Sequence, residues 1–178
     1  MRWYDDMYGF KLDNKKHILN LYITPSFRKS VCFQVHQMDD DSLELFWNFE
    51  LESRELLPFM REFVKNNNLP ERIKVVDLFE DVEFVKALKK KCPVSKSALS
   101  KEQIEIIDRV INTGIPIDVK KHYGLDGHSY TIEIFGEKNQ IYESWCLLPE
   151  EWQVFSPLIE MVVSIAGLDN VRYGNKNY

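Results

Sequence analysis

The sequence predicts a single α+β domain over residues 1–178, in which an antiparallel sheet packs against helices. Short runs of alternating apolar and polar residues recur in both halves of the chain, as expected of strands with two unlike faces. Other segments repeat apolar residues at spacings of three and four, the pattern of helices with one buried side. With 178 residues, 44% of them hydrophobic, the chain is long enough to bury a sizeable core.

The first half is expected to begin with three strands, at residues 17–24, 30–37 and 43–51. In the second of these, Val31, Phe33 and Val35 alternate with less apolar residues and therefore share one face. Phe46 falls on the opposite face of the third strand from its other apolar residues, so both faces of that strand are expected to be covered.

Three helices are expected to follow, at residues 53–66, 81–91 and 100–114. The first ends at a run of asparagines before Pro70, and the second stops before Pro93. The third begins at Ser100, a residue type favoured at helix starts, and Gly114 is expected to cap its end. The segment 93–100 between the last two helices is expected to be a surface loop.

The second half repeats the order of a hairpin followed by a helix. Strands are expected at residues 129–135 and 141–147, after an Asp126-Gly127 turn. Pro149 is expected in the first turn of the last helix, which ends at Gly167. Pro157 lies inside this helix, so either the helix kinks there or a new helix starts at Ser156.

A constant offset of 99 residues aligns the hairpin and helix of the first half with those of the second, without a gap. The two units are residues 17–70 and 116–173, with a helical segment at 81–114 between them. One explanation is an internal duplication. The other is that strand–turn–strand–helix is a common unit, so that any two copies align roughly.

Charge is unevenly distributed along the chain. The net charge of -5 arises after residue 122, where eight acidic residues face three basic ones. Phosphate binding needs clustered Lys and Arg, so no nucleic-acid partner is expected, and an acidic surface suits a basic protein partner. The sequence lacks an apolar run of about 20 residues, so no membrane partner is expected either.

The cysteines and the first residues favour a cytoplasmic protein. Cys32, Cys92 and Cys146 are odd in number and widely spaced, unlike the disulfide framework of a small exported domain. The stretch MRWYDDMYGF is acidic where a secretion signal would be basic and then apolar.

Motifs for catalysis are weak. The spacing of His122, Asp126 and His128 would suit a zinc or iron site in a small hydrolase or metalloenzyme. Against this, Asp126-Gly127 is an ordinary turn dipeptide, and His128 can simply open a strand. The sequence contains no G-x-S-x-G element and no glycine-rich phosphate loop. It therefore favours a protein that is not an enzyme, without a metal or cofactor, although an enzyme is not excluded.

The C-terminal third resembles a group of known proteins. The run LDGHSYTIE at residues 125–133, then Tyr142-x-x-Trp145 and Pro149 before an amphipathic helix, is similar to small bacterial cytoplasmic proteins of unassigned function. Some of these are thought to be immunity proteins of polymorphic or contact-dependent toxins. The resemblance implies a non-enzymatic protein that binds and occludes a toxin, and it transfers no contact residue.

The leading hypothesis from the sequence is therefore a protein-binding module, with toxin neutralisation as its most concrete form and a basic toxin domain as partner. The alternatives are the metalloenzyme described above and a structural or dimeric scaffold subunit, since the oligomeric state is left open. The residues expected to contact the partner are acidic: Asp39, Asp40, Asp41, Asp126, Glu137 and Glu143.

Overall fold

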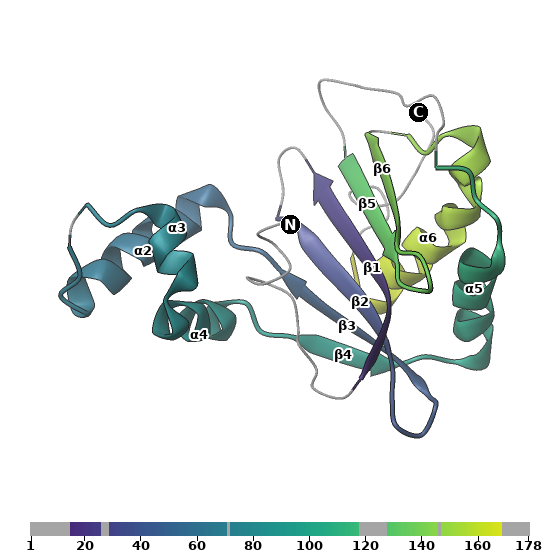
Figure 1. The fold of residues 1–178 in the computed structure, drawn as a ribbon, viewed down its shortest axis with the longest axis horizontal. Helices are drawn as coiled ribbons and strands as arrows, with labels where there is room; N and C mark the ends of the chain where they lie inside the picture. Colours follow the sequence, from purple (N-terminus) through teal and green to yellow (C-terminus); the bar gives the residue numbers. More distant parts are fainter. Residues whose placement is uncertain (1–14, 26–28, 71, 118–127, 146, 169–178) are drawn as a thin grey trace.

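The computed structural model describes residues 15–25, 29–70, 72–117, 128–145 and 147–168. Within these residues, six strands form one sheet in the order β4-β3-β2-β1-β5-β6, and every neighbouring pair is antiparallel (Figure 1). The α+β class expected from the sequence is confirmed. The strands are β1 (Lys16–Pro25), β2 (Val31–Gln37), β3 (Leu43–Phe49), β4 (Ser95–Ala98), β5 (His128–Ile134) and β6 (Gln140–Trp145).

The helices form two groups. One group lies between β3 and β4 in the chain, and the other comprises α5 and the C-terminal helices. No helix in the described part of the chain is long and apolar enough to cross a membrane. The helices are α2 (Ser53–Asn66), α3 (Val75–Glu80), α4 (Val82–Lys91), α5 (Lys101–Asn112), the 3-10 helix η1 (Glu150–Phe155) and α6 (Ser156–Ile165).

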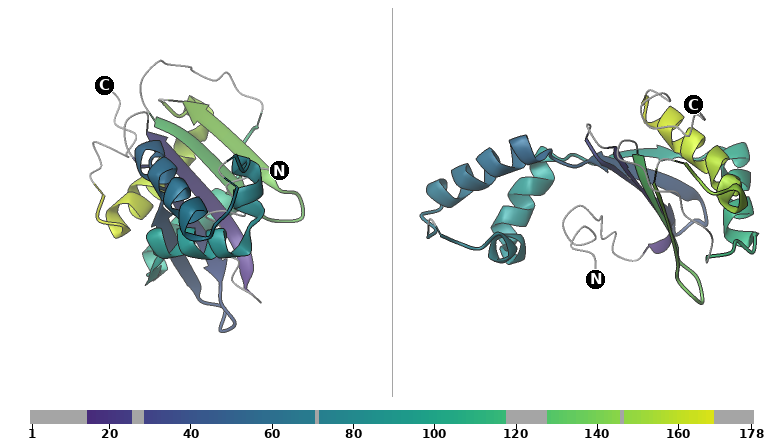
Figure 2. Two further views of the ribbon diagram at one scale, coloured as in Figure 1. Left: turned by 90° about the vertical axis from the view of Figure 1, so that its left-hand side faces the viewer. Right: turned by 90° about the horizontal axis from the view of Figure 1, so that it is seen from above.

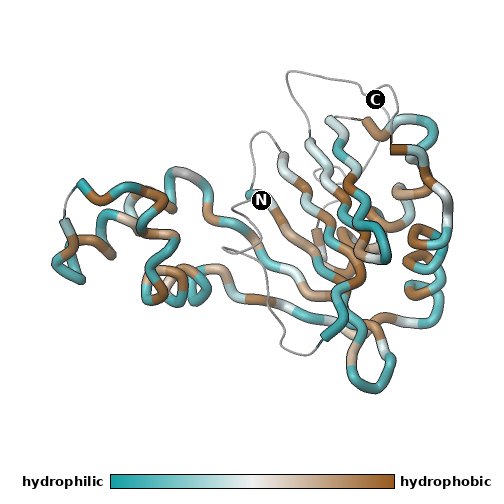
Figure 3. Tube along the Cα trace, in the orientation of Figure 1, coloured by the Kyte–Doolittle hydropathy of each residue, from teal (hydrophilic) through white to brown (hydrophobic). Residues whose placement is uncertain are grey.

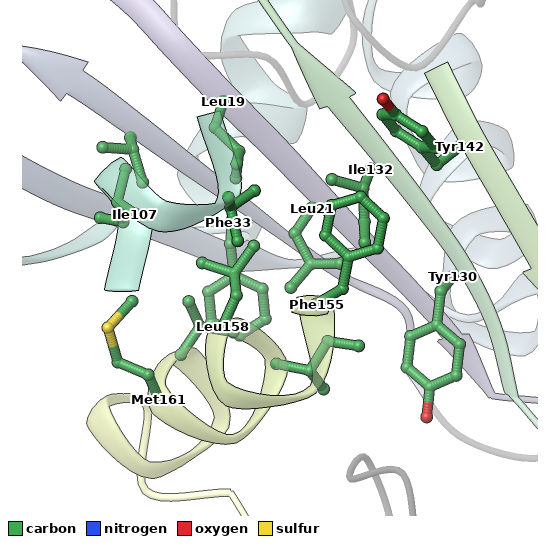
Figure 4. Packing of buried hydrophobic residues seen from close by; sticks show 14 of the residues in the cluster. Leu19, Leu21, Phe33, Ile107, Tyr130, Ile132, Tyr142, Phe155, Leu158 and Met161 are labelled. Carbon is green, nitrogen blue, oxygen red and sulfur yellow. The ribbon is translucent and has the colours of Figure 1, made fainter. Parts of the chain in front are cut away.

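The main core lies between one face of the sheet and the second group of helices. Leu19, Leu21 and Ile23 of β1 occupy its centre and are fully buried. Their neighbours in register are apolar residues of β2 and β5, which extend this face across the sheet. Figure 4 shows Phe155 of η1 reaching toward Leu21 and Ile132. Burial of these side chains by α5, η1 and α6 is the dominant stabilising contribution in this half of the molecule.

The first group of helices (α2, α3 and α4, here called the lobe) extends away from the sheet beyond β3 and β4 (Figures 1 and 2). The lobe has its own small core, separate from the main one. Phe84 is at its centre, with its ring 5.1 Å from that of Phe63, 5.3 Å from that of Phe79 and 5.5 Å from that of Phe59. The buried residues of this core are Met60, Leu78, Phe84, Leu88 and Cys92.

The two sequence units at residues 17–70 and 116–173 share the order of a hairpin followed by a helix, but their helices pack differently. Helix α6 covers the sheet, whereas α2 belongs to the lobe. Strand β1 lies between the two hairpins and pairs with β2 on one side and β5 on the other.

The structure corrects three local expectations. Ser95–Ala98 is an edge strand paired with β3, in the segment expected to be a loop. Helix α5 ends with Thr113 at its C-cap, and Gly114 lacks the positive φ of a glycine cap. The C-terminal segment is not one helix from Pro149: a 3-10 helix comes first, and a new helix then begins at Ser156, the second of the two expected alternatives.

Candidate functional site

The face of the sheet opposite the main core carries polar side chains (here called the polar face). Asn20 of β1 lies opposite Gln34 of β2 and Glu133 of β5. A bulge between His17 and Leu19 shifts the register, so that His17 lies opposite His36 instead of sharing the face of Leu19. The buried polar residues of this face are Asn20, Gln34, His36, Asn48 and Glu133, none more than 7% exposed.

Asn20 forms hydrogen bonds with three neighbouring side chains, those of Glu133, Tyr22 and His17. Its Nδ2 donates to Glu133 Oε2 at 2.9 Å and to the Tyr22 hydroxyl at 3.2 Å. Its Oδ1 is therefore the acceptor toward His17 Nε2 at 2.6 Å, and this nitrogen carries the proton. Every polar atom of the Asn20 side chain is thus engaged between strands β1 and β5. Such a buried hydrogen-bonded network fixes the register of β1 against β5, which gives Asn20 and Glu133 a structural role.

The two histidines of the polar face are stacked. The ring centroids of His17 and His36 are 4.5 Å apart, and the rings are nearly parallel at 7°. Burial, together with the nearby charge of His17, lowers the pKa of His36 to about 4. His36 is therefore neutral at pH 7, which lets the two imidazoles stack without mutual repulsion. Its Nε2 lies 3.3 Å from Gln34 Oε1, and its Nδ1 is buried with no hydrogen-bond partner among the described residues.

A second polar cluster lies where the lobe joins the sheet. Burial raises the pKa of Glu50 to about 7, against the opposing effect of a hydrogen bond from Ser30. Burial also raises the pKa of the Cys92 thiol, at the end of α4. Lys29 is paired with Glu55 at 2.8 Å in the same region. Because its pKa is raised, the Cys92 thiol is protonated at neutral pH and therefore unreactive. Its burial indicates the same.

The lobe carries a groove of about 780 Å³ along one side of α2. Its lining residues are Leu57, Met60, Arg61, Val64, Lys65, Asn68, Leu69, Ile73 and Leu78. The end of α2 holds this wall in place through a Schellman motif. Asn68 has a positive φ of 52° and donates its N–H to Lys65 O, while Leu69 N–H donates to Val64 O at 3.0 Å.

The lobe also exposes apolar side chains outside its core. Figure 3 shows apolar and polar residues alternating along its helices. Val75 and Val76 at the start of α3 are 47% and 48% exposed, Val82 at the start of α4 is 64% exposed, and Leu57 of α2 is 51% exposed. Half of the large apolar side chains that are exposed in the described residues therefore belong to the lobe.

The acidic residues expected to contact a partner are distributed over several places. Asp39, Asp40 and Asp41 form the β2–β3 turn. Their carboxylates bond Lys15 Nζ at 2.7 Å, the Ser42 hydroxyl at 2.6 Å and Gln37 Nε2 at 3.0 Å, respectively. The hydrogen bonds from Ser42 hold the pKa of Asp40 below its ordinary value.

Strand register places Glu137, in the β5–β6 turn, at the same end of the sheet as these aspartates. Glu143 lies instead within β6, opposite Thr131. Asp126 lies outside the described residues, so the structure brings four of the six residues to one end of the sheet.

The metal-site expectation remains a prediction. His122 and Asp126 lie outside the described residues. His128 opens β5 and is half-buried, and burial lowers its pKa. Among the residues that the structure describes, no group of three or more His, Cys, Asp or Glu side chains could hold a metal ion.

Comparison with protein-family models finds no match, and searches of curated proteins and of solved structures likewise return no significant match. The function is therefore argued from the geometry of this chain.

Proposed function

We propose that this chain is a non-enzymatic protein-binding module, and that its most concrete form is a bacterial cytoplasmic immunity protein that neutralises a toxin. The observation that carries this proposal is the exposure of four large apolar side chains on the lobe: Leu57, Val75, Val76 and Val82. Exposed apolar side chains that gather on one part of a protein are characteristic of surfaces that bind other proteins.

The acidic end of the sheet supports a basic partner. Asp39, Asp40, Asp41 and Glu137 lie together there, and the aspartates are exposed. Opposite charges on two proteins mainly increase the association rate, whereas apolar contacts in the centre of an interface mainly slow dissociation. In this proposal the lobe therefore supplies most of the affinity, and the acidic end of the sheet raises the rate of association.

The candidate partner for a first experiment is the protein encoded by the gene next to this one. If that protein inhibits growth when expressed, co-expression of this chain should restore growth. The double variant Val76→Gln/Val82→Gln should bind the partner at least about tenfold more weakly, because two exposed apolar contacts are lost. Lys90→Gln, on an exposed residue of α4, is the matched control and should bind like the wild type.

Association kinetics separate the two surfaces. Asp39→Asn/Glu137→Gln should lower the association rate and its dependence on salt while leaving the dissociation rate unchanged. Partner binding that is indifferent to both pairs of substitutions would contradict this proposal.

Light scattering tests the remaining alternative, a dimeric scaffold. A mass of 21.1 kDa in solution leaves the apolar lobe surface open to a different protein. A dimer that Val76→Gln/Val82→Gln converts to monomers would make a second copy of this chain the occupant of the lobe, and would replace the toxin proposal.

A further inference from the structure

The groove along α2 has the size and lining of a small-molecule site. Its volume of about 780 Å³ is within the ~300–1,000 Å³ typical of sites for small ligands. Six of its lining side chains are apolar, and Met60 and Leu78 among them are 7% and 2% exposed. Such sites combine a mostly apolar lining with a few polar groups that fix the ligand's orientation.

The polar groups of the groove are cationic. Arg61 and Lys65 lie one helical turn apart on α2, a spacing that puts their Cβ atoms about 5–6 Å apart. Among the residues that the structure describes, no carboxylate lines the groove. Within the part of the chain that the structure describes, neither Arg61 nor Lys65 forms an ion pair, whereas the nearby Arg54 is paired with Glu52. The groove therefore offers two cationic side chains to one anionic group.

The end of α2 is the less favourable end of a helix for an anion, since it carries about half a negative charge. Two effects outweigh this. The Schellman motif already satisfies the carbonyls of Val64 and Lys65. The side chains of Arg61 and Lys65 bring two full positive charges to the same turn of the helix. An anion at this rim is thus attracted on balance.

We infer that this groove binds an amphiphilic carboxylate, a single apolar chain with one terminal carboxylate, whose chain lies along Met60, Val64 and Leu78 and whose carboxylate contacts Arg61 and Lys65. An acidic peptide helix is the competing occupant, since it would place only one of its faces in the groove. The two cations lie one helical turn apart and so form a single anion site, which matches one carboxylate.

Dodecanoate is the probe for this inference, titrated calorimetrically below its micellar concentration at pH 7.5 and low ionic strength. We expect one molecule to bind per chain. Dodecanol and dodecyltrimethylammonium, which have the same chain without the negative charge, should bind about tenfold more weakly or not at all. Equal binding of all three compounds, or no binding of dodecanoate, would overturn the inference.

Two variants test the site itself. Arg61→Gln/Lys65→Gln should weaken dodecanoate binding about tenfold, because both cations are lost. Leu57→Glu should weaken it too, since this exposed lining residue would then present a carboxylate to the ligand. Circular dichroism checks that each variant is folded. Lys90→Gln, outside the groove, is the matched control and should bind normally.

Val76→Gln/Val82→Gln keeps this inference distinct from the protein-binding proposal. Neither valine lines the groove, so this variant should bind dodecanoate normally even where it no longer binds a protein partner. Two results would show that the groove does not have the assigned specificity. One is that Arg61→Gln/Lys65→Gln binds dodecanoate with wild-type affinity. The other is that the wild type binds an acidic helical peptide in place of dodecanoate.

Discussion

His36 is buried and Glu50 is half-buried, and their pKa values shift in opposite directions. The pKa of His36 is lowered to about 4, and that of Glu50 is raised to about 7. As the pH falls, His36 takes up a proton near pH 6.5 in the unfolded state but only near pH 4 in the folded state. Acidification from pH 6.5 to 4 therefore destabilises the fold. As the pH rises, Glu50 stays protonated to a higher pH in the folded state than in the unfolded state. Its contribution to stability is complete below pH 4.5 and is lost as the pH rises toward 7.

The two effects oppose each other between about pH 4.5 and 6.5. Each shift corresponds to about 3 kcal/mol at most, so the wild type should show only a shallow change in stability across this window. His128 adds a smaller effect with the same sign as that of His36, because burial lowers its pKa too.

Single substitutions should reveal the two contributions. Relative to the wild type, the free energy of unfolding of Glu50→Gln should rise more steeply from pH 5 to 7, because only the histidines then titrate. In His36→Gln the same profile should be flatter or should fall, since the effect of Glu50 remains. Urea denaturation at four pH values measures both slopes. Parallel profiles for the two variants would show that these pKa shifts do not control stability.

At the scale of helices, α2 and α6 end in the same way. In each, the residue after the C-cap has positive φ: 52° at Asn68 and 66° at Gly167. The next residue, Leu69 or Leu168, donates its N–H to a valine carbonyl five residues earlier. These equivalent positions are 99 residues apart, the offset that aligns the two halves of the sequence. The shared ending agrees with duplication and equally with the frequent use of this motif in unrelated helices.

Gly167→Ala should destabilise the protein by about 1 kcal/mol or somewhat more, because an L-residue with a side chain is strained at positive φ. Gly114→Ala is the matched control. An added Cβ meets nothing within 4 Å at either glycine, but Gly114 has no positive φ. This control should therefore be neutral or slightly stabilising, as fewer unfolded conformations remain. Thermal unfolding of both variants measures the difference. Equal changes in stability for the two variants would mean that a side chain at residue 167 causes no backbone strain.

Most of the elements were predictable because their apolar periodicity is strong. Helix α2 was expected at its observed bounds, and five of the six strands were expected within one or two residues. Strand β4 was missed because Ser95–Ala98 is almost wholly exposed and carries no apolar alternation. Ser95–Ala98 is a strand only because it pairs with β3. That pairing depends on the fold of the lobe, which brings residue 95 back beside the sheet. Helix α3 was missed for a related reason, since its two valines face solvent.

Only some residues of the polar face could be predicted from the sequence. The alternation in β2 already placed Gln34 and His36 opposite the apolar residues of that strand. The partner of Asn20 could not be inferred, because Glu133 is 113 residues away and only the β1–β5 register brings them together. The position of His17 depends on a bulge that has no sequence signature here. The groove was missed as well, since it requires the arrangement of α2 against residues 69–78.

At the scale of the whole molecule, the separate cores of the sheet and the lobe imply unequal stability. The lobe core contains five buried residues, whereas the main core extends across the sheet and the helices α5, η1 and α6. A small core buries less apolar surface, so the lobe should unfold locally at a lower free energy than the sheet. A binding surface carried on the less stable part of a protein can adjust to its partner without disturbing the sheet.

Phe84→Ala tests this division. Phe84 is fully buried among Phe59, Phe63 and Phe79, and a Phe→Ala change in such a position costs about 3–5 kcal/mol. We expect the loss to exceed what the lobe core can sustain, so that amide hydrogens of residues 53–91 exchange rapidly while those of β2 and β5 stay protected. Hydrogen exchange measured by mass spectrometry gives both results in one experiment.

Phe33→Ala is the control, since Phe33 is fully buried in the main core and the same substitution there should lower protection in the sheet. Equal loss of protection in the lobe and the sheet of Phe84→Ala would mean that the two cores unfold as one unit. The sheet would then stabilise the folded lobe through the junction at Glu50 and Cys92. In that case Glu50→Gln should alter exchange in both parts, whereas with independent cores it should affect mainly the residues beside the junction.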